Sequence, residues 1–385
     1  LCDRRQRQMC IRDSTKIGTI IDATGYNKPV IIIKTEGDEW EESIDRSDAL
    51  ETLDGHDGLT PEYIITRIRD AGITGMGGAG FPTYVKLTPP STSKIDCVII
   101  NAVECEPYIT SDYRLMMEHA DEILVGVKLV LMAVSAPVAY IGIERNKPAA
   151  IRLFQEKTIG ERSIKIVPLE QKYPQGGEKQ LIDAVIRRQV PDPPAIPANV
   201  GTVVVNVGTA FAVYQAVMKN KPLFERYTSV SGKHISQPKN FLVRMGTPIS
   251  QLIDACGGLP DGDNKIIAGG PMMGKALMTT GVPVCKGTNS ITVLSGKEAV
   301  RGGAIGPCIR CAKCVGVCPM GLEPYILATS SAAHNWEMAE EHFITSCIEC
   351  GSCQYTCPAN RPMLDNIRFG KSKVMTIIRA RKQKS

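Results

Sequence analysis

The stretches CIRCAKCVGVCP, residues 308–319, and CIECGSCQYTCP, residues 347–358, carry the same spacing of four cysteines followed by proline. This C-x2-C-x2-C-x3-C-P spacing is the ligand pattern of bacterial ferredoxins, and two copies predict two [4Fe–4S] clusters. Clusters of this kind carry single electrons. The pattern therefore predicts a ferredoxin-like helical domain over residues 303–369 and a role in electron transfer.

Each cluster is expected to draw its ligands from both cysteine runs. Three cysteines separated by two residues can wrap one face of a cubane, whereas the fourth lies too far round the loop and binds the other cluster. One predicted set is Cys308, Cys311, Cys314 and Cys357, and the other is Cys347, Cys350, Cys353 and Cys318. Zinc fits this spacing poorly, because each run offers three close cysteines and a more distant fourth. Disulfides are not expected, because such spacing in an intracellular chain indicates metal binding.

The composition is that of an ordinary globular chain. Its 385 residues predict two or three domains, and 43% hydrophobic residues provide enough apolar mass for their cores. The net charge of +5 is mild, so no nucleic-acid partner is expected. The most apolar stretch, residues 122–134, is short and contains Lys128, so no transmembrane segment is expected.

The two ends of the chain carry separate predictions. Residues 1–14 are rich in arginine and are interpreted as a non-native leader. Residues 15–58 read as part of a β-rich N-terminal domain followed by an acidic linker, with the first half of that domain missing. Residues 370–385 form a basic stretch without acids, predicted either as a solvated tail or as a docking segment for an acidic partner or membrane.

The central part of the chain alternates between strand and helix patterns. Strands are expected at 97–100, 138–143, 164–167 and 202–207, and helices at 117–134, 147–157, 178–188 and 209–218. This alternation predicts a Rossmann-like layered α/β domain with a mainly parallel sheet over residues 59–221. Residues 222–295 contain short β pieces and one helix, which predicts a small α+β module.

Four polar or glycine-rich segments of the α/β domain indicate a sizeable ligand. GMGGAG at 75–80 satisfies G-x-G-x-x-G, but it follows a helix and no long helix opens after it, so it is not a dinucleotide turn of the Rossmann type. NAVECEP at 101–107 follows a strand, YPQGGEK at 173–179 opens a helix, and Asn206 precedes Gly208 and Thr209 at another helix start. Glycine-rich loops and helix starts let backbone N–H groups approach an anionic ligand.

Taken together, these motifs resemble the C subunit of the Rnf ion-translocating electron-transport complex over residues 15–370. More distantly, they resemble the NADH-oxidising flavoprotein subunit of respiratory complex I. The resemblance implies that FMN and NAD(H) bind the α/β domain, that residues 222–295 are a β-grasp, SLBB-like module, and that the N-terminal residues are the remnant of a β-rich hybrid domain. Val103, Gly177 and Val205 depart from the complex I pattern, so flavin contacts are not inherited there.

The resemblance also implies roles for individual residues. Glu106 would lie near the nicotinamide as the catalytic residue. The residues expected to bind the flavin are Gly75, Gly77, Gly78, Gly80, Lys86, Asn101, Glu104, Gly176, Glu178, Asn206 and Thr209.

The expected function is therefore that of an oxidoreductase subunit. It would exchange electrons between NAD(H), FMN and two [4Fe–4S] clusters, on the cytoplasmic side of the cell membrane, while partner subunits couple the flow between ferredoxin and NAD to Na⁺ or H⁺ transport. One alternative is a corrin reductase of the propanediol-utilisation type. The other is a polyferredoxin subunit whose α/β domain is a docking scaffold without catalytic activity.

Overall fold

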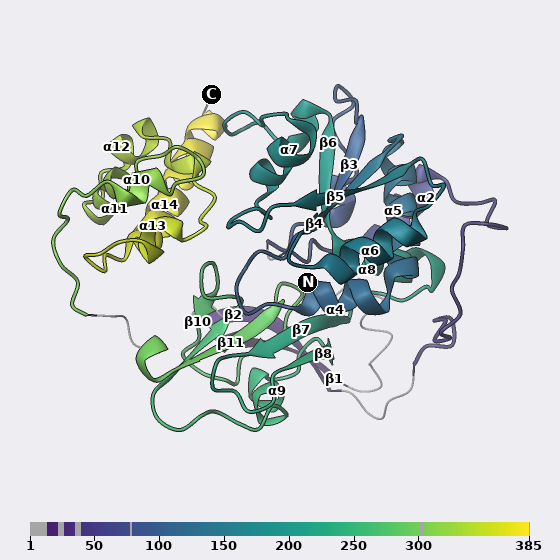
Figure 1. Cartoon of the computed structure of the whole chain (residues 1–385), viewed down its shortest axis with the longest axis horizontal. Coiled ribbons are helices and arrows are strands. Elements are labelled where there is room, and N and C mark those ends of the chain that lie inside the picture. Colours follow the sequence, from purple (N-terminus) through teal and green to yellow (C-terminus); the bar gives the residue numbers. More distant parts are fainter. Residues whose placement is uncertain (1–13, 22–26, 35–39, 78, 300–302, 385) are drawn as a thin grey trace.

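The computed structural model describes residues 14–21, 27–34, 40–77, 79–299 and 303–384 (Figure 1). The first strands, β1 (Ser14–Ile21) and β2 (Asn27–Lys34), pair antiparallel, with Ser14 opposite Lys34. The predicted leader lies outside the described residues except for Ser14. From residue 40 to residue 58, in the region expected as a linker, the described chain forms no helix or strand.

A four-stranded parallel sheet forms the centre of the α/β domain, as predicted. Its strands are β3 (Cys97–Ala102), β4 (Ala139–Glu144), β5 (Ile164–Leu169) and β6 (Thr202–Asn206), in the order β5-β4-β3-β6. The chain proceeds outward from β3 to β5 and then returns to place β6 on the other side of β3. This reversal makes the β3/β6 boundary the switch point of the sheet, where open α/β sheets bind ligands.

Helices cover both faces of this sheet. They are α2 (Pro61–Asp70), α3 (Thr83–Lys86), α4 (Ser111–Glu118), α5 (Ala120–Val134), α6 (Pro148–Lys157), α7 (Glu178–Ile186) and α8 (Val207–Met218), with a 3₁₀ turn at Pro197–Val200. On β3, Val98 and Ile100 join the core under α5 and α8, whereas Ile99 joins the core under α7. A strand alternates its side chains between faces, so β3 supports two separate cores.

The predicted helix 117–134 is wrong in one respect, because the structure divides this region into α4 and α5 at His119. The His119 backbone leaves helical geometry, with φ −129° and ψ 39°. Its imidazole contacts Glu122 through Nδ1 at 2.9 Å and the Tyr227 hydroxyl through Nε2 at 2.8 Å. The break therefore ties the α/β domain to the module that follows, a contact that helical periodicity could not reveal.

The next module is a five-stranded mixed sheet with one helix. Its strands are β7 (Glu225–Ser231), β8 (Lys239–Arg244), β9 (Asn264–Ala268), β10 (Lys275–Ala276) and β11 (Ser290–Ser295), in the order β10-β9-β11-β7-β8. Helix α9 (Ile249–Asp254) packs on it through Ile249, Leu252 and Ile253. A 3₁₀ turn at Gly296–Glu298 ends the module. This arrangement confirms the predicted α+β module.

The cysteine-rich domain is helical, as predicted. It contains α10 (Lys313–Gly316), α11 (Pro324–Ala332), α12 (Trp336–Glu341), a 3₁₀ turn (Ile344–Ser346), α13 (Ser352–Tyr355) and α14 (Met363–Lys384). Figure 1 shows these helices gathered at one end of the molecule, beside α7. The basic residues expected as a tail continue α14 as far as Lys384. In the described part of the chain, no helix combines the length and apolarity needed to cross a bilayer.

Candidate functional site

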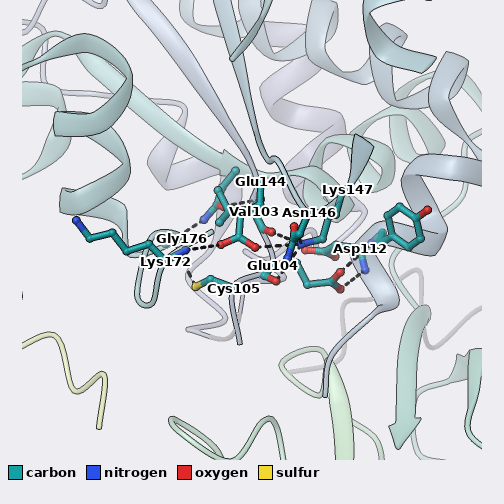
Figure 2. A network of polar contacts seen from close by, with 11 residues as sticks. Val103, Glu104, Cys105, Asp112, Glu144, Asn146, Lys147, Lys172 and Gly176 are labelled. Atoms are coloured by element: carbon teal, nitrogen blue, oxygen red, sulfur yellow. Dashed lines mark hydrogen bonds and ion pairs between the residues drawn. The ribbon is translucent and has the colours of Figure 1, made fainter. Parts of the chain in front are cut away.

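The polar residues predicted on separate segments meet at the switch point of the parallel sheet. Asn101 on β3 and Asn206 on β6 are register partners at the carboxyl ends of neighbouring strands. Figure 2 shows the polar network that continues from the end of β3 through Val103, Glu104 and Cys105. Parallel strands end at one edge of the sheet, so residues distant in sequence form one site.

The glycine-rich loop lies over the end of β6 and the start of α8. The Met76 N–H donates to Thr209 Oγ1 at 2.9 Å, and the Gly75 N–H donates to the Phe81 carbonyl oxygen at 2.8 Å, which closes the loop. A Cβ atom on Gly77 would lie 3.7 Å from Asn206 Cβ. Gly80 has φ +64°, a conformation that favours glycine. Gly78, also predicted to bind the flavin, lies outside the described residues.

Asn206 organises the start of α8. Its Oδ1 accepts hydrogen bonds from the N–H groups of Gly208 at 2.9 Å and Thr209 at 3.3 Å, as a helix N-cap does. Its Nδ2 donates to Asp112 Oδ2 at 2.7 Å. The cap leaves the positive end of the α8 dipole facing the glycine-rich loop, where an anionic group is favoured.

Asn101 joins the end of β3 to the loop before α7. Its Nδ2 donates to the Gly176 carbonyl oxygen at 2.8 Å, and the Gly176 N–H donates to Cys105 Sγ at 3.3 Å. A Cβ atom on Gly176 would lie 3.4–3.5 Å from Cys105, Asn101 and Val103, which is ordinary van der Waals contact. These contacts and hydrogen bonds pack the loop against the end of β3.

Lys86 and Glu178 form an ion pair at the start of α7. Lys86 Nζ lies 2.7 Å from Glu178 Oε1 and also donates to the Val204 carbonyl oxygen at 3.0 Å. The lysine is thus held between β6 and α7. The structure brings these two predicted residues together, and it gives the lysine a protein partner that the sequence interpretation did not foresee.

Glu104 caps α4 and shares its surroundings with Asp112. Its two carboxylate oxygens accept the N–H groups of Asp112 at 2.7 Å and Tyr113 at 3.1 Å. Burial, followed by the nearby Asp112 charge, raises the pKa of Glu104 to about 8, and burial also raises the pKa of Asp112. Two neighbouring carboxyl groups that are withdrawn from water resist ionising together, so the pair retains a proton above the ordinary carboxyl range.

The raised pKa of Glu104 predicts a pH dependence of stability in the flavin-free protein. Between its ordinary value of 4.5 and about 8, the folded chain binds more protons than the unfolded chain. Linkage then makes the free energy of unfolding fall as the pH rises through that window. Urea unfolding across this range should show the fall, and Glu104→Gln should flatten it. Glu118→Gln, at an exposed position on α4, is the control and should show the same fall as the unmodified chain. An undiminished fall in Glu104→Gln would show that another group causes the pH dependence.

A buried ion pair that sequence reasoning missed supports the end of β3. Glu144 is 2% exposed and Lys147 is 9% exposed, and their Oε2 and Nζ atoms lie 3.3 Å apart. Lys147 Nζ also donates to the carbonyl oxygens of Val103 at 2.8 Å and Glu104 at 3.3 Å (Figure 2). Glu144 is the last residue of a parallel strand, as Asn206 is, and Asn101 is the last but one of its strand, so the strand-end rule could have found Glu144. Lys147 carried no comparable signal.

Glu106, predicted beside the nicotinamide, contacts the turn between β9 and β10. Its Oε1 accepts the N–H groups of Met272 at 2.7 Å and Met273 at 2.9 Å. Burial raises its pKa, although these hydrogen bonds oppose the effect. Glu106 therefore joins the α/β domain to the five-stranded module.

The second predicted set of cluster ligands lines one cavity. Cys318 from the first run and Cys347, Cys350 and Cys353 from the second run all border it. These thiols are close enough to influence one another, and burial raises the pKa of Cys353 to about 12. A thiol in these surroundings needs a metal cation to stabilise its thiolate. The Leu322 N–H donates to Cys318 Sγ and the Glu349 N–H to Cys347 Sγ, both at 3.4 Å, a type of contact that tunes cluster potentials.

The first predicted set lies nearer the surface. Cys308 and Cys311 are exposed, whereas Cys314 and Cys357 are half-buried in the core of this domain. The Gly306 N–H donates to the Ala359 carbonyl oxygen at 2.9 Å, which ties the start of the first run to the end of the second. Within the described residues, no three His, Cys, Asp or Glu side chains are placed to hold a single metal ion.

The α/β site has the chemistry that a flavin phosphate and ring system require. It offers a glycine-rich loop, the capped start of α8 and amide side chains at the switch point. Among the described residues, no acceptor bonds the N–H groups of Gly77 or Ala79, both of which are exposed. Open N–H groups beside a helix start fit an anionic group. Fold and site together define a class of electron-transfer proteins that combine a flavin-binding α/β domain with a two-cluster ferredoxin domain.

Comparison with family models assigns the parts of the chain in the same order. Residues 68–215 match the Nuo51 FMN-binding domain, residues 227–276 match the SLBB domain, and residues 305–358 match the 4Fe-4S dicluster domain. These matches confirm the predicted fold class and the expectation of FMN and iron–sulfur clusters.

The chain belongs to the family formed by the C subunits of ion-translocating oxidoreductase complexes. It is 42% identical to the C subunit of the proton-translocating ferredoxin:NAD(+) oxidoreductase complex of Clostridium ljungdahlii, over 92% of this chain and 78% of that protein. It is 40% identical to the Na(+)-translocating counterpart of Acetobacterium woodii, with the same two coverages. The C subunit of the ion-translocating oxidoreductase complex of Rhodobacter capsulatus is 38% identical, over 91% of this chain and 66% of that protein. The expected family is thereby confirmed, and the corrin-reductase alternative is not retained.

A solved structure supports the fold independently. An NAD⁺-reducing [NiFe]-hydrogenase in the air-oxidised state superposes with a TM-score of 0.51 at 25% sequence identity. The match covers 62% of this chain and 47% of the matched hydrogenase chain, which is about half of that chain's length.

Proposed function

We propose that this chain is the NAD(H)-linked subunit of a ferredoxin:NAD⁺ oxidoreductase complex. In this role it exchanges electrons between NAD(H), FMN and two [4Fe–4S] clusters. Partner subunits couple that exchange to Na⁺ or H⁺ transport, with ferredoxin served indirectly. The chain lies peripherally on the cytoplasmic side of the cell membrane. The names of its relatives and the order of its domains support this proposal.

The residues at the switch point would hold FMN. The open N–H groups of the glycine-rich loop and the start of α8 would bind its phosphate, and Asn101 with Gly176 would border its ring system. Bound FMN supplies the conversion between a two-electron hydride and single electrons, which NAD(H) and the clusters cannot achieve alone. Thr209 holds the glycine-rich loop on α8, and Asn206 caps that helix. Lys147, paired with Glu144, holds the end of β3.

The observation that carries this proposal is a contact between two loops. One is the loop at 170–177 before α7, here called the flavin loop, and the other is the loop at 347–353 that carries the second cysteine run, here called the Cys350 loop. The Tyr173 hydroxyl, on the loop before α7, donates to the Cys350 carbonyl oxygen at 2.6 Å. On α7 itself, Gln180 Nε2 lies 3.0 Å from Sδ of Met320, which is two residues after Cys318. A flavin on this loop would lie next to a cluster held by Cys318 and Cys350, as single-electron exchange requires.

The test is anaerobic purification after reconstitution with iron, sulfide and FMN, followed by spectroscopy and NADH–viologen assays. We expect one tightly bound flavin, two clusters by electron paramagnetic resonance (EPR), and bleaching of both on NADH addition. Protein that holds both clusters but neither binds FMN nor reacts with NADH would instead be a polyferredoxin subunit.

Asn101→Ala is expected to weaken FMN binding by about tenfold. It removes the Asn101–Gly176 hydrogen bond, and freeing an ordered loop at a ligand site costs about 1–1.5 kcal/mol. Fluorescence titration of flavin-free protein measures the change. Asn199→Ala, in the 3₁₀ turn at Pro197–Val200, is the control and should bind FMN as the unmodified chain does. Unchanged FMN affinity in Asn101→Ala would remove this residue from the site.

A further inference from the structure

Glu106 and Tyr173 lie where the three parts of the protein meet. Glu106 follows β3, Tyr173 precedes α7, and both belong to the α/β domain. The two side chains are near neighbours: burial raises the pKa of the Tyr173 hydroxyl, and the nearby Glu106 charge raises it further. One then contacts the five-stranded module and the other contacts the cluster domain, so the pair links all three.

The contact of Glu106 with the five-stranded module is close and specific. One carboxylate oxygen accepts two successive N–H groups, those of Met272 and Met273. A Cβ atom on Gly270 would lie 2.1 Å from Glu106 Cγ, so only glycine fits at that position. The turn between β9 and β10 is therefore shaped around this carboxylate.

The same turn also contacts the cluster domain. A Cβ atom on Gly351, directly after Cys350, would lie 2.4 Å from the Met272 carbonyl oxygen, and Gly351 has φ +79°. Arg368 on α14 donates through Nη2 to the Met273 carbonyl oxygen at 2.7 Å and through Nε to Glu349 at 3.2 Å. Together with the bond from Tyr173 to Cys350, these contacts fix the 349–351 segment on two sides.

We propose that Glu106 and Tyr173 are positioning residues that hold the Cys350 loop against the flavin loop. The cluster bound by Cys318, Cys347, Cys350 and Cys353, here called the inner cluster, is then the first to exchange electrons with the flavin. The cluster near exposed Cys308 and Cys311 is the outer cluster. This inference rests on the proposed function. It also gives Glu106 a different role from that of a nicotinamide contact, because its Oε1 is engaged by the Met272 and Met273 N–H groups.

The test compares Glu106→Ala, Glu106→Gln and Tyr173→Phe in the cofactor-loaded protein. Stopped-flow absorbance follows flavin reduction by NADH, and freeze-quench EPR follows reduction of each cluster. Glu106→Ala should slow reduction of the inner cluster by roughly tenfold, and Tyr173→Phe by roughly fivefold, because each loses hydrogen bonds that hold the loop. Glu106→Gln keeps an oxygen acceptor and should stay within about threefold. Flavin reduction should be unchanged in all three.

Hydrogen exchange at Met272 and Met273 gives a readout that does not depend on activity. These two amides should exchange roughly tenfold faster in Glu106→Ala than in Glu106→Gln. Tyr140→Phe, on β4, is the matched control and should change neither exchange nor electron transfer. If the unmodified protein fails to react with NADH, the proposed function is wrong, and the exchange data still decide whether Glu106 holds the turn.

Two results would overturn the inference. The first is flavin reduction slowed equally in Glu106→Ala and Glu106→Gln with unchanged amide exchange, which would return Glu106 to the nicotinamide site. The second is an unchanged rate of inner-cluster reduction in Tyr173→Phe and Glu106→Ala.

Discussion

Cys318→Ala is expected to abolish the cluster whose other ligands lie in the second run and to leave the cluster of its own run intact. The reason is the cavity that Cys318 shares with Cys347, Cys350 and Cys353. About half of the iron and sulfide should be lost, because each cluster contains the same number of atoms. Chemical iron analysis and EPR of the dithionite-reduced protein measure both effects.

Cys357→Ala is the reciprocal variant. It should remove the outer cluster and keep the inner one, so the two variants should give different residual EPR signals with the same iron loss. Cys285→Ala, at an exposed cysteine outside both runs, should keep both clusters. Loss of the outer cluster in Cys318→Ala, with the inner cluster retained, would show that each run binds its own cluster.

Lys147→Met is expected to lower the free energy of unfolding of the α/β domain by about 3–5 kcal/mol, because it leaves Glu144 buried without its partner. It also removes the donor to the carbonyl oxygens of Val103 and Glu104, so FMN should be released more readily. Urea unfolding followed by circular dichroism gives the first effect, and flavin content after gel filtration gives the second.

The control for this prediction is an exposed ion pair of similar chemistry. Lys157 Nζ lies 2.7 Å from Asp121 Oδ2, with side-chain exposures of 31% and 48%. Lys157→Met should cost at most about 1 kcal/mol, because water screens such pairs. Adding Glu144→Gln to Lys147→Met should restore part of the lost stability. Equal losses in Lys147→Met and Lys157→Met would contradict the assigned role of burial.

The fold was largely predictable because its signals are local. The four strands of the parallel sheet and most of the helices that cover it follow from alternating apolar patterns. Local signals also begin α2, where the Thr60 side chain caps the helix and Pro61 is its first residue. The helix break at His119 was not predictable, because it depends on a contact with Tyr227 in another module. The length of α14 was also missed, because its basic composition resembles that of a solvated tail.

The candidate site was predictable in its residue types and less so in its contacts. Glycines and amides at strand ends marked the region, and the structure brings Asn101, Asn206 and Gly176 together there. The buried Glu144–Lys147 pair was missed, because the sequence does not reveal which charged side chains become buried when the chain folds. The role of Glu106 beside the nicotinamide stays a prediction; nothing in the sequence indicated that its carboxylate also accepts the N–H groups of Met272 and Met273.

The sequence by itself determined that this protein carries electrons, since cysteine spacing restricts which irons a short loop can reach. It also determined the parallel α/β domain, because the spacing of apolar residues along each segment distinguishes a strand from a helix. It further predicted that Cys318 joins Cys347, Cys350 and Cys353, but only the tertiary structure placed these four cysteines around one cavity and set that cavity against the loop before α7. Those relationships join segments far apart in the chain, and the packing of three domains at Glu106 and Tyr173 brings them together.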